Sequence, residues 1–345
     1  MYLPNTYVSA LLLIILSMVC WGSWANMQKL AGQWRFELFY YDYSLGVLLT
    51  AVLAAYTLGS MNPSELTFVD NLMLTGYRKM TYAVAAGVVF NLANMLLVGA
   101  IALSGMAVAF PVGIGLAMVI GVAWNYKLNP QGDPLLLFVG SLMVVAAILV
   151  DAMAYGMHSS ANATRTSAKA AREKRRRTTK GLIVSLISGV LMGSFYPLVA
   201  MSQQEDNGLA PYSVILLFSA GVFLSTLVFN LFFLNLPLDG EPIEMIEYLK
   251  GTGKQHLLGL AGGAIWCAGG LANFLAAGAP PKVNVGPAVS YAVGQGATMV
   301  SALWGLLVWN EFAGAVRQVK ILLAAMIVLF LAGLTVLSIA PLYGK

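Results

Sequence analysis

The stretch LANMLLVGA (Leu92–Ala100) occurs a second time, with few changes, as LANFLAAGA (Leu271–Ala279). Each copy is followed by another matching stretch, VGIGLAMV (Val112–Val119) in the first half and VGQGATMV (Val293–Val300) in the second. The two matches are separated by 179 and 181 residues, so they occur in the same order and almost in register. Either match alone is explained by the bias of the chain towards Gly, Ala, Val and Leu. Together they indicate a long internal repeat, which sets the architecture.

The composition predicts a membrane protein. Hydrophobic residues make up 59% of the 345 residues, charged residues make up 10%, and the mean hydropathy is +0.79. Such a chain is too apolar for a soluble globule. A membrane-spanning helix needs about 20 mostly apolar residues. Ten such runs are present, at residues 8–27, 39–59, 81–102, 106–126, 134–155, 181–201, 212–234, 256–278, 285–309 and 320–340. We therefore predict an all-α polytopic membrane protein with ten transmembrane helices.

The charges predict the orientation. Residues 159–180 carry eight Lys and Arg against the single Glu173, and basic segments of this kind remain cytoplasmic. We expect a first five-helix repeat at 1–158, a disordered basic cytoplasmic linker at 159–180 and a second five-helix repeat at 181–345. The protein is expected to span the cytoplasmic (inner) membrane, with both termini on the outer side. This orientation places 14 of the 19 Lys and Arg inside. Because each half has an odd number of spans, the second half enters the membrane upside down, and such inverted repeats are typical of secondary transporters.

Amide side chains within the third and eighth spans are the first candidate site residues. Asn91 and Asn94 are three residues apart and share a helix face, and Asn273 repeats Asn94 in the second half. An amide in hydrocarbon must find a partner. Helix–helix hydrogen bonding explains a single Asn equally well, but its repetition favours a solute-binding role.

The ninth span adds a further amide and a phenol. Gln295 stands where the first copy has Ile114, and Tyr291 precedes it by one turn on the same face. The predicted cavity is therefore symmetric in its scaffold and unequal in its chemistry. We expect most solute contacts to come from the second half.

Aromatic residues flank these amides. Trp21 and Trp24 are three apart on one face of the first span, Tyr196 lies in the matching part of the sixth span, and Trp266 precedes Asn273 by two helical turns. Such residues form walls for a planar or sugar-like solute. For the tryptophans of the first span, an interfacial aromatic belt is an equal alternative.

Three acidic residues lie near span ends. Asp42 sits among phenols in the second span and is a proton-coupling or gating candidate, with helix capping as the alternative. Glu311 follows the ninth span and is expected to be either a gate or an anchor paired with Arg317. We expect Asp151, in the fifth span, to reach the interface and be solvated.

The sequence lacks patterns for several other activities. It has no catalytic triad, no paired carboxylates, no phosphate-binding loop, and no metal-ligand or cofactor pattern. The basic linker has no interleaved aromatic residues, so no nucleic-acid partner is expected. The scarcity of mid-membrane charge favours a neutral solute. We expect a transporter rather than an enzyme, and a membrane receptor or scaffold that binds a partner through the linker remains an alternative.

Several motifs resemble those of the ureide permeases, a branch of the drug/metabolite transporter superfamily that also contains bacterial glucose/ribose-type porters. They are Tyr41-Asp42-Tyr43-Ser44, the run Ala86-Gly87-Val88-Val89 leading to Asn94, Asn125-Tyr126, the basic linker, and the Gly-rich eighth span ending in Asn273. The resemblance implies a five-plus-five inverted-repeat bundle with alternating access, often proton-coupled. It implies a small neutral polar solute, either a nucleobase, ureide or nucleoside-like compound or a sugar such as ribose or glucose.

Overall fold

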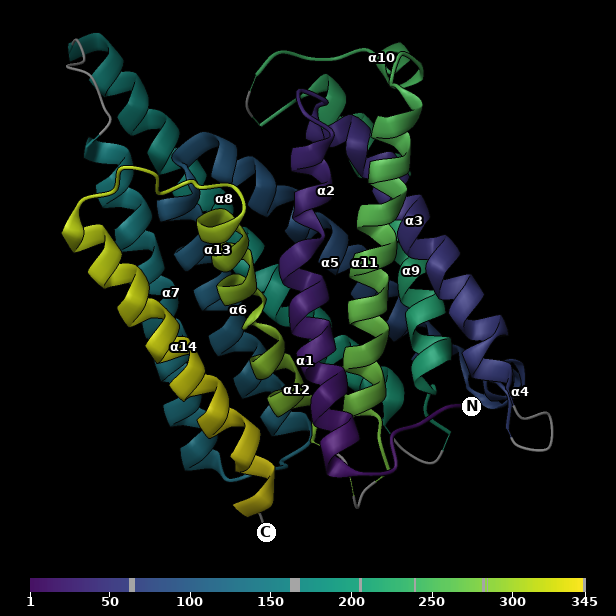
Figure 1. Cartoon of the computed structure of the whole chain (residues 1–345). Helices are drawn as coiled ribbons and strands as arrows, with labels where there is room; N and C mark the ends of the chain where they lie inside the picture. Colours follow the sequence, from purple (N-terminus) through teal and green to yellow (C-terminus); the bar gives the residue numbers. More distant parts are fainter. Residues whose placement is uncertain are drawn as a thin grey trace.

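The computed structural model describes the chain except residues 62–65, 162–167, 205–206, 239, 281–282, 284 and 344–345, and the described residues form a bundle of helices (Figure 1). In the first half these are α1 (Tyr7–Ser23), α2 (Ala25–Leu30), α3 (Phe36–Tyr56), the 3-10 turn η1 (Leu58–Ser60), α4 (Phe68–Leu74), α5 (Tyr77–Ser104), α6 (Met106–Leu128) and α7 (Pro134–Ala161). In the second half they are α8 (Ala168–Gln203), α9 (Pro211–Asn235), α10 (Ile246–Leu249), α11 (Gly253–Ala277), α12 (Pro287–Gly294), α13 (Ala297–Leu307) and α14 (Arg317–Tyr343).

Local sequence sets several helix ends. Thr6, Thr67 and Thr252 each form a capping box with the residue three positions later, which satisfies backbone N–H groups at the starts of α1, α4 and α11. α9 begins with Pro211 at its first position, where the missing N–H has no helical partner in any case. The helices therefore begin where the polar stretches between apolar runs supply caps.

Nine helices in the described part of the chain are long and apolar enough to cross a membrane. They match nine of the ten predicted spans. The prediction of one continuous helix over 285–309 is wrong, because the chain breaks into α12 and α13 at Gln295-Gly296. The two turn residues, Gln295 and Gly296, follow Gly294 and interrupt the helix at this point, and discontinuous helices of this kind line binding sites in transporters.

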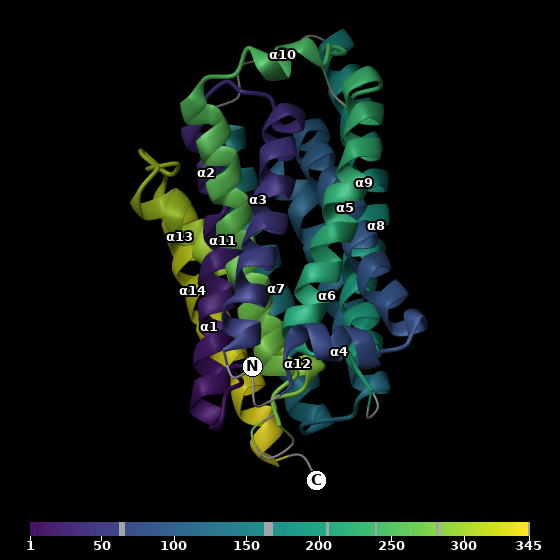
Figure 2. The same cartoon turned by 90° about the vertical axis from the view of Figure 1, so that its right-hand side faces the viewer.

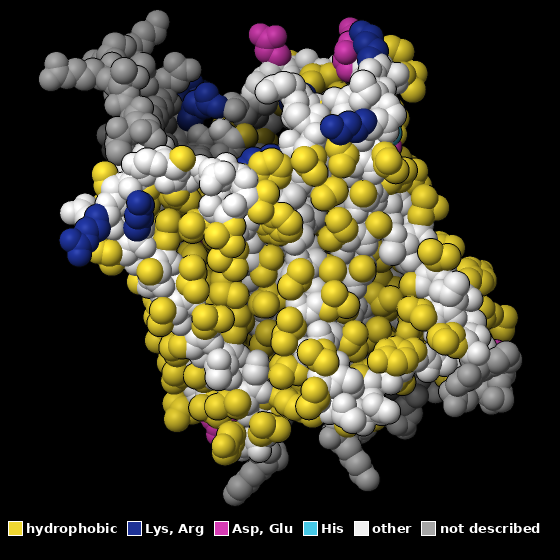
Figure 3. Space-filling view, viewed as in Figure 1, with side chains coloured by type: hydrophobic (Ala, Val, Ile, Leu, Met, Phe, Trp, Pro, Cys, Tyr) yellow, Lys and Arg dark blue, Asp and Glu magenta, His cyan; other side chains and the backbone are white. Residues whose placement is uncertain are grey.

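The outer surface is apolar over most of its height (Figure 3). Large hydrophobic side chains exposed on the long helices include Leu12, Leu53, Phe138, Val228 and Val328. In the face drawn in Figure 3, Lys and Arg gather at the end of the bundle where α7 leads into α8. We call this the linker end, and the opposite end, where α1 begins and α14 finishes, the terminal end (Figures 1 and 2). The chain is a multi-pass membrane protein.

The packing of the helices in one half mirrors that in the other. α1 packs on α11 as α8 packs on α5, α3 packs on α11 as α9 packs on α5, and α13 packs on α1 as α6 packs on α8. Two helices meet their own counterparts, α3 on α9 and α7 on α14. Exchanging the halves therefore leaves this set of contacts unchanged.

Close glycine contacts repeat at the level of single residues. A Cβ atom on Gly87 of α5 would lie 2.1 Å from the backbone oxygen of Phe218, and one on Gly263 of α11 would lie 2.0 Å from that of Tyr43. Gly87 and Gly263 are 176 residues apart, and Tyr43 and Phe218 are 175 apart. Only glycine allows such approach, so both halves use the same contact between equivalent helices.

This packing register differs from that of the repeated sequence motif. Asn94 and Asn273 are 179 residues apart, three more than the glycine contacts on the same two helices. Three residues are almost one helical turn. The two asparagines therefore sit at different depths relative to the shared scaffold.

The basic linker is partly helical. It was expected to be disordered, but α8 begins at Ala168, inside the 159–180 segment, and continues to Gln203. Residues 162–167 lie outside the described part of the chain.

Candidate functional site: a central aromatic and amide cluster

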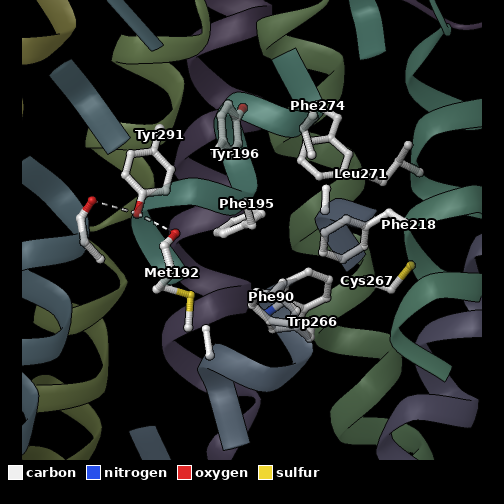
Figure 4. Packing of buried hydrophobic residues seen from close by; sticks show 14 of the residues in the cluster. Phe90, Met192, Phe195, Tyr196, Phe218, Trp266, Cys267, Leu271, Phe274 and Tyr291 are labelled. Atoms are coloured by element: carbon white, nitrogen blue, oxygen red, sulfur yellow. Dashed lines mark hydrogen bonds between the residues drawn. The ribbon is translucent and has the colours of Figure 1, made fainter. Parts of the chain in front are cut away.

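Three aromatic rings form a stack where α1, α9 and α11 meet. The Trp21 and Trp266 ring centroids are 5.9 Å apart at an interplanar angle of 20°, and Trp266 lies 5.6 Å from Phe218 at 10°. Phe90 of α5 approaches Trp266 to 4.5 Å (Figure 4). Trp266 is the middle ring and is 4% exposed, whereas Trp21 is only half-buried. The accessible ring of the stack is therefore Trp21.

Asn273 is fully buried, and its amide is fully engaged with protein groups. Its Nδ2 donates to Ser17 Oγ and to the Ser290 carbonyl oxygen, each at 3.2 Å. Its Oδ1 accepts from the Tyr196 hydroxyl and from Ser290 Oγ. These bonds join α1, α8, α11 and α12. The structure therefore brings the predicted site residues Asn273 and Tyr196 together, in one hydrogen-bond network between four helices.

The first-half amides have different surroundings. Asn94 donates to the Tyr40 hydroxyl at 3.1 Å and is 7% exposed. Asn91, predicted to share its face, donates instead to the Val222 carbonyl, Ser225 and Thr226 of α9. Asn91 thus joins two helices, while Asn94 faces α3 in the interior.

Tyr291 lies in the last turn of α12, and Gln295 lies at the break between α12 and α13. The Tyr291 hydroxyl donates to the carbonyl oxygens of Ala117 and Met192, at 3.2 and 3.3 Å (Figure 4). Gln295 is half-buried at the break itself. The backbone of the adjoining Gly294 lies close to both the Trp21 ring and the Asn273 amide, because a Cβ there would lie 2.9 Å from Trp21 and 3.2 Å from Asn273.

Two buried donors in this region have no hydrogen-bond partner among the described residues. They are the indole N–H of Trp21 and the hydroxyl of Tyr43. The Tyr43 ring lies 4.8 Å from both Trp24 and Tyr40. A buried donor left unpaired costs about 1–3 kcal/mol, and a ligand acceptor that reached either group would offset that cost. We define the central cluster as Trp21, Trp24, Tyr40, Tyr43, Phe90, Asn94, Tyr196, Phe218, Trp266 and Asn273.

Two of the cavities among the described residues lie at opposite ends of the bundle, and a further one, lined by residues that include Leu234 and Ile243, shares the linker end. The linker-end cavity has a volume of about 330 Å³ and is lined by residues that include Phe36, Val98 and Gly99. The terminal-end cavity has a volume of about 200 Å³ and is lined by residues that include Ala277 and Gly278. Val98-Gly99 and Ala277-Gly278 are the same positions of the two motif copies. Each copy of the repeat therefore lines a cavity at a different end.

Asp42 lies outside the cluster, at the linker end of α3, and is buried. It accepts from the Tyr248 hydroxyl at 2.7 Å and lies 2.8 Å from His256 Nδ1. Burial, together with the bond to Asp42, raises the pKa of Tyr248 above its ordinary value. Neither partner of Asp42 was predicted from the sequence. The position of His256 directly after Lys254-Gln255, at the start of a span, was the available signal, but it does not identify Asp42 as its partner.

Glu311 lies after α13, also at the linker end, where it contacts α2 and α7. It forms an ion pair with Lys29 and accepts from the Tyr155 hydroxyl at 2.7 Å. The predicted pairing of Glu311 with Arg317 is wrong, because the chain turns at Asn310 (φ 51°) and directs Glu311 back towards Lys29 of α2. Burial raises the pKa of Glu311, but the Lys29 and Tyr155 bonds outweigh it, so the pKa is lowered below its usual value.

Asp151 is buried rather than solvated, so the expectation of an interfacial group is wrong. It is 7% exposed, and its Oδ1 has no hydrogen-bond partner among the described residues. The segment after α13 covers this part of α7, with Phe312 packed on Tyr155.

Comparisons with known proteins agree with this architecture. The sequence profile of the ureide permease family matches residues 39–180 and 167–340. The chain is 25% identical to ureide permease 1 and 22% identical to ureide permease 2 of Arabidopsis thaliana, and each alignment covers 100% of both proteins. A solved crystal structure with 17% identity matches with a TM-score of 0.62, covering 95% of this chain and 96% of the other, and so shares the fold.

The fold and these matches define a multi-pass membrane permease, which is a transporter rather than an enzyme. The chain belongs to the ureide permease family. The family resemblance drawn from the sequence motifs is therefore confirmed.

Proposed function

We propose that the protein is a proton-coupled secondary transporter that imports a small, neutral, planar solute, a nucleobase or a ureide. Relatives along its whole length are ureide permeases of Arabidopsis thaliana, which supports this solute class. Nucleobases offer a flat conjugated ring, ureides offer planar urea groups, and both present carbonyl acceptors and N–H donors without net charge. The solute's carbonyl groups then pair with donors of the central cluster, and its flat face stacks on an indole.

One observation carries the assignment of the site. The Trp21 N–H and the Tyr43 hydroxyl are buried donors without a protein partner, and both lie beside aromatic rings. A solute carbonyl that pairs with them removes the cost of burying them unpaired. Asn94, with a single bond to Tyr40, supplies a third polar contact.

Stacking geometry indicates which ring face the solute uses. A ring inserted between two others needs about 7 Å between them, twice the usual contact distance of about 3.5 Å. Trp21 and Trp266 are 5.9 Å apart, and Trp266 is covered on its other side by Phe218. The solute therefore stacks on the outer face of Trp21, and Trp266 supports Trp21 from behind.

We further propose that the chain is a five-plus-five inverted repeat that works by alternating access. The exchange of equivalent contacts between halves and the paired glycine contacts support the repeat. The two end cavities, each lined by one copy of the same motif, support access from either side. Basic residues at the linker end favour a cytoplasmic position for this end, with both termini outside.

Asp42 and Glu311 act as gates at the linker end. Asp42 ties α3 to α10 and α11 through Tyr248 and His256, and Glu311 ties α2 to α7 through Lys29 and Tyr155. Opening this end requires both sets of bonds to break.

Uptake into proteoliposomes tests the proposal. Vesicles with an alkaline interior are expected to accumulate labelled uracil or allantoin, and unlabelled ribose and glucose are expected not to compete. Accumulation of sugars alone would establish the sugar-porter alternative instead. Loss of a bound partner without any uptake defect, after deletion of residues 167–177, would support the scaffold alternative.

A further inference from the structure

Asp151 of α7 is a buried acid that the proposed gates do not use. It is 7% exposed and lies inside a membrane-spanning helix. Within the described part of the chain no hydrogen bond or ion pair reaches it, and its Oδ1 is fully enclosed. An unpaired carboxylate in such surroundings costs several kcal/mol, and a buried acid takes up a proton instead of bearing that cost.

The groups around Asp151 support the neutral form. From the segment after α13, Glu311 is close enough to interact with it electrostatically, and Tyr155 lies one turn along α7. Of the basic groups on the elements packed here, Lys29 is engaged by Glu311, and His158 of α7 and Arg317 and Lys320 of α14 make no ion pair with Asp151 among the described residues. α14 buries Val319 and Leu323 in this region, and α6 has no titratable residue between positions 106 and 115. Asp151 therefore lies near the Glu311 carboxylate and the Tyr155 hydroxyl, and apolar side chains of α14 pack in the same region.

We propose that Asp151 is a proton-binding site of the transport cycle, separate from the Asp42 and Glu311 gates. This inference rests on the proposed transport function. On this proposal Asp151 holds its proton in the present conformation, in the part of α7 where Tyr155 contacts Glu311 and Phe312 of the segment after α13. When the Lys29–Glu311 contact opens, water reaches Asp151. Its O–H bond then breaks, the proton passes to that water, and the carboxylate remains until it takes up another proton.

Two uptake modes in proteoliposomes test this role with labelled uracil and labelled allantoin as probes. Counterflow at equal pH needs substrate binding and conformational change, whereas accumulation driven by a pH gradient also needs proton coupling. Asp151→Asn mimics the protonated acid, so counterflow is expected to be retained and gradient-driven accumulation to be lost. Asp70→Asn, a matched change of an exposed helix-capping acid, is expected to keep both modes.

The outcomes separate the two proposals. Gradient-driven accumulation in Asp151→Asn equal to that of wild type would overturn the proton site and leave the transport function standing. Absence of both modes in wild type would count against the transport function. An infrared measurement then still decides the proton site, because wild type should show the carbonyl stretch of a protonated carboxyl at neutral pH. Loss of that band in Asp151→Asn supports the assignment, and an unchanged spectrum overturns it.

Discussion

The two halves of the molecule share a scaffold but differ in how they use their polar groups. Gly87 and Gly263 make the same close backbone contact in the two halves. By contrast, Asn273 is fully buried with four hydrogen bonds, while Asn94 has one and lies nearly a turn out of register. Within the central cluster, the two buried donors that have no partner among the described residues, on Trp21 and Tyr43, both belong to the first half. Equivalent glycine contacts thus recur in the packing of both halves, whereas the hydrogen bonds of the two asparagines differ between them.

The largest expected effects test the shared scaffold. Gly87→Ala and Gly263→Ala should each lower the free energy of unfolding by about 3 kcal/mol, because the added methyl group forces two helix backbones apart. Denaturant-induced unfolding of the purified protein in detergent measures this. Gly115→Ala, where no atom lies within 4 Å of the added Cβ, is the control. Equal stability of all three variants would contradict the paired contacts.

The next prediction concerns the unequal amides. Asn273→Ala should destabilise the protein by about 2–4 kcal/mol, because it leaves several buried partners unsatisfied, whereas Asn94→Ala should cost about 1 kcal/mol. The same unfolding assay compares them. Equal losses would show that the two asparagines are equivalent after all. Because Asn273→Ala disturbs the fold, only Asn94→Ala reports on solute binding without that complication.

A smaller effect is expected at the linker-end gate. Glu311 has a lowered pKa, so its bond to Lys29 stabilises the protein above the ordinary Glu pKa of about 4.3 and is lost as the pH falls through the lower folded-state value. Glu311→Gln should therefore reduce stability by less than about 1 kcal/mol at neutral pH, since the pair is partly exposed. Thermal unfolding across pH checks this. If Glu311→Gln were still less stable than wild type in strong acid, the loss of stability could not be due to the ionised Glu311–Lys29 pair.

Much of this architecture follows from the sequence. Apolar runs of membrane-spanning length predict nine of the long helices, and the repeated motif points to Asn94 and Asn273 in the interior. Trp21 and Trp266, chosen by helical spacing from different helices, stack on each other. Periodicity identifies such positions because it reports which face of a helix is buried.

Contacts between distant segments were not predictable in the same way. Tyr248 and His256 lie more than 200 positions from Asp42, and spacing along one helix carries no information on partners from another. Asp151 looked solvated because it is near a span end, yet the segment around Phe312 folds over that part of α7. The break at Gln295-Gly296 was not predicted, because the matching glycines Gly113 and Gly115 lie inside a continuous helix, α6.

The most direct test of the central claim is uracil binding by Tyr43→Phe, measured calorimetrically beside the thermal stability of the same protein. The lost hydroxyl has no partner among the described residues, so stability should be unchanged while affinity falls about tenfold, equivalent to about 1.4 kcal/mol. Tyr212→Phe, a matched loss of a hydroxyl bonded to the Tyr2 carbonyl, should bind uracil like wild type. Unchanged affinity in Tyr43→Phe, with wild type binding uracil, would contradict the central cluster as the solute site.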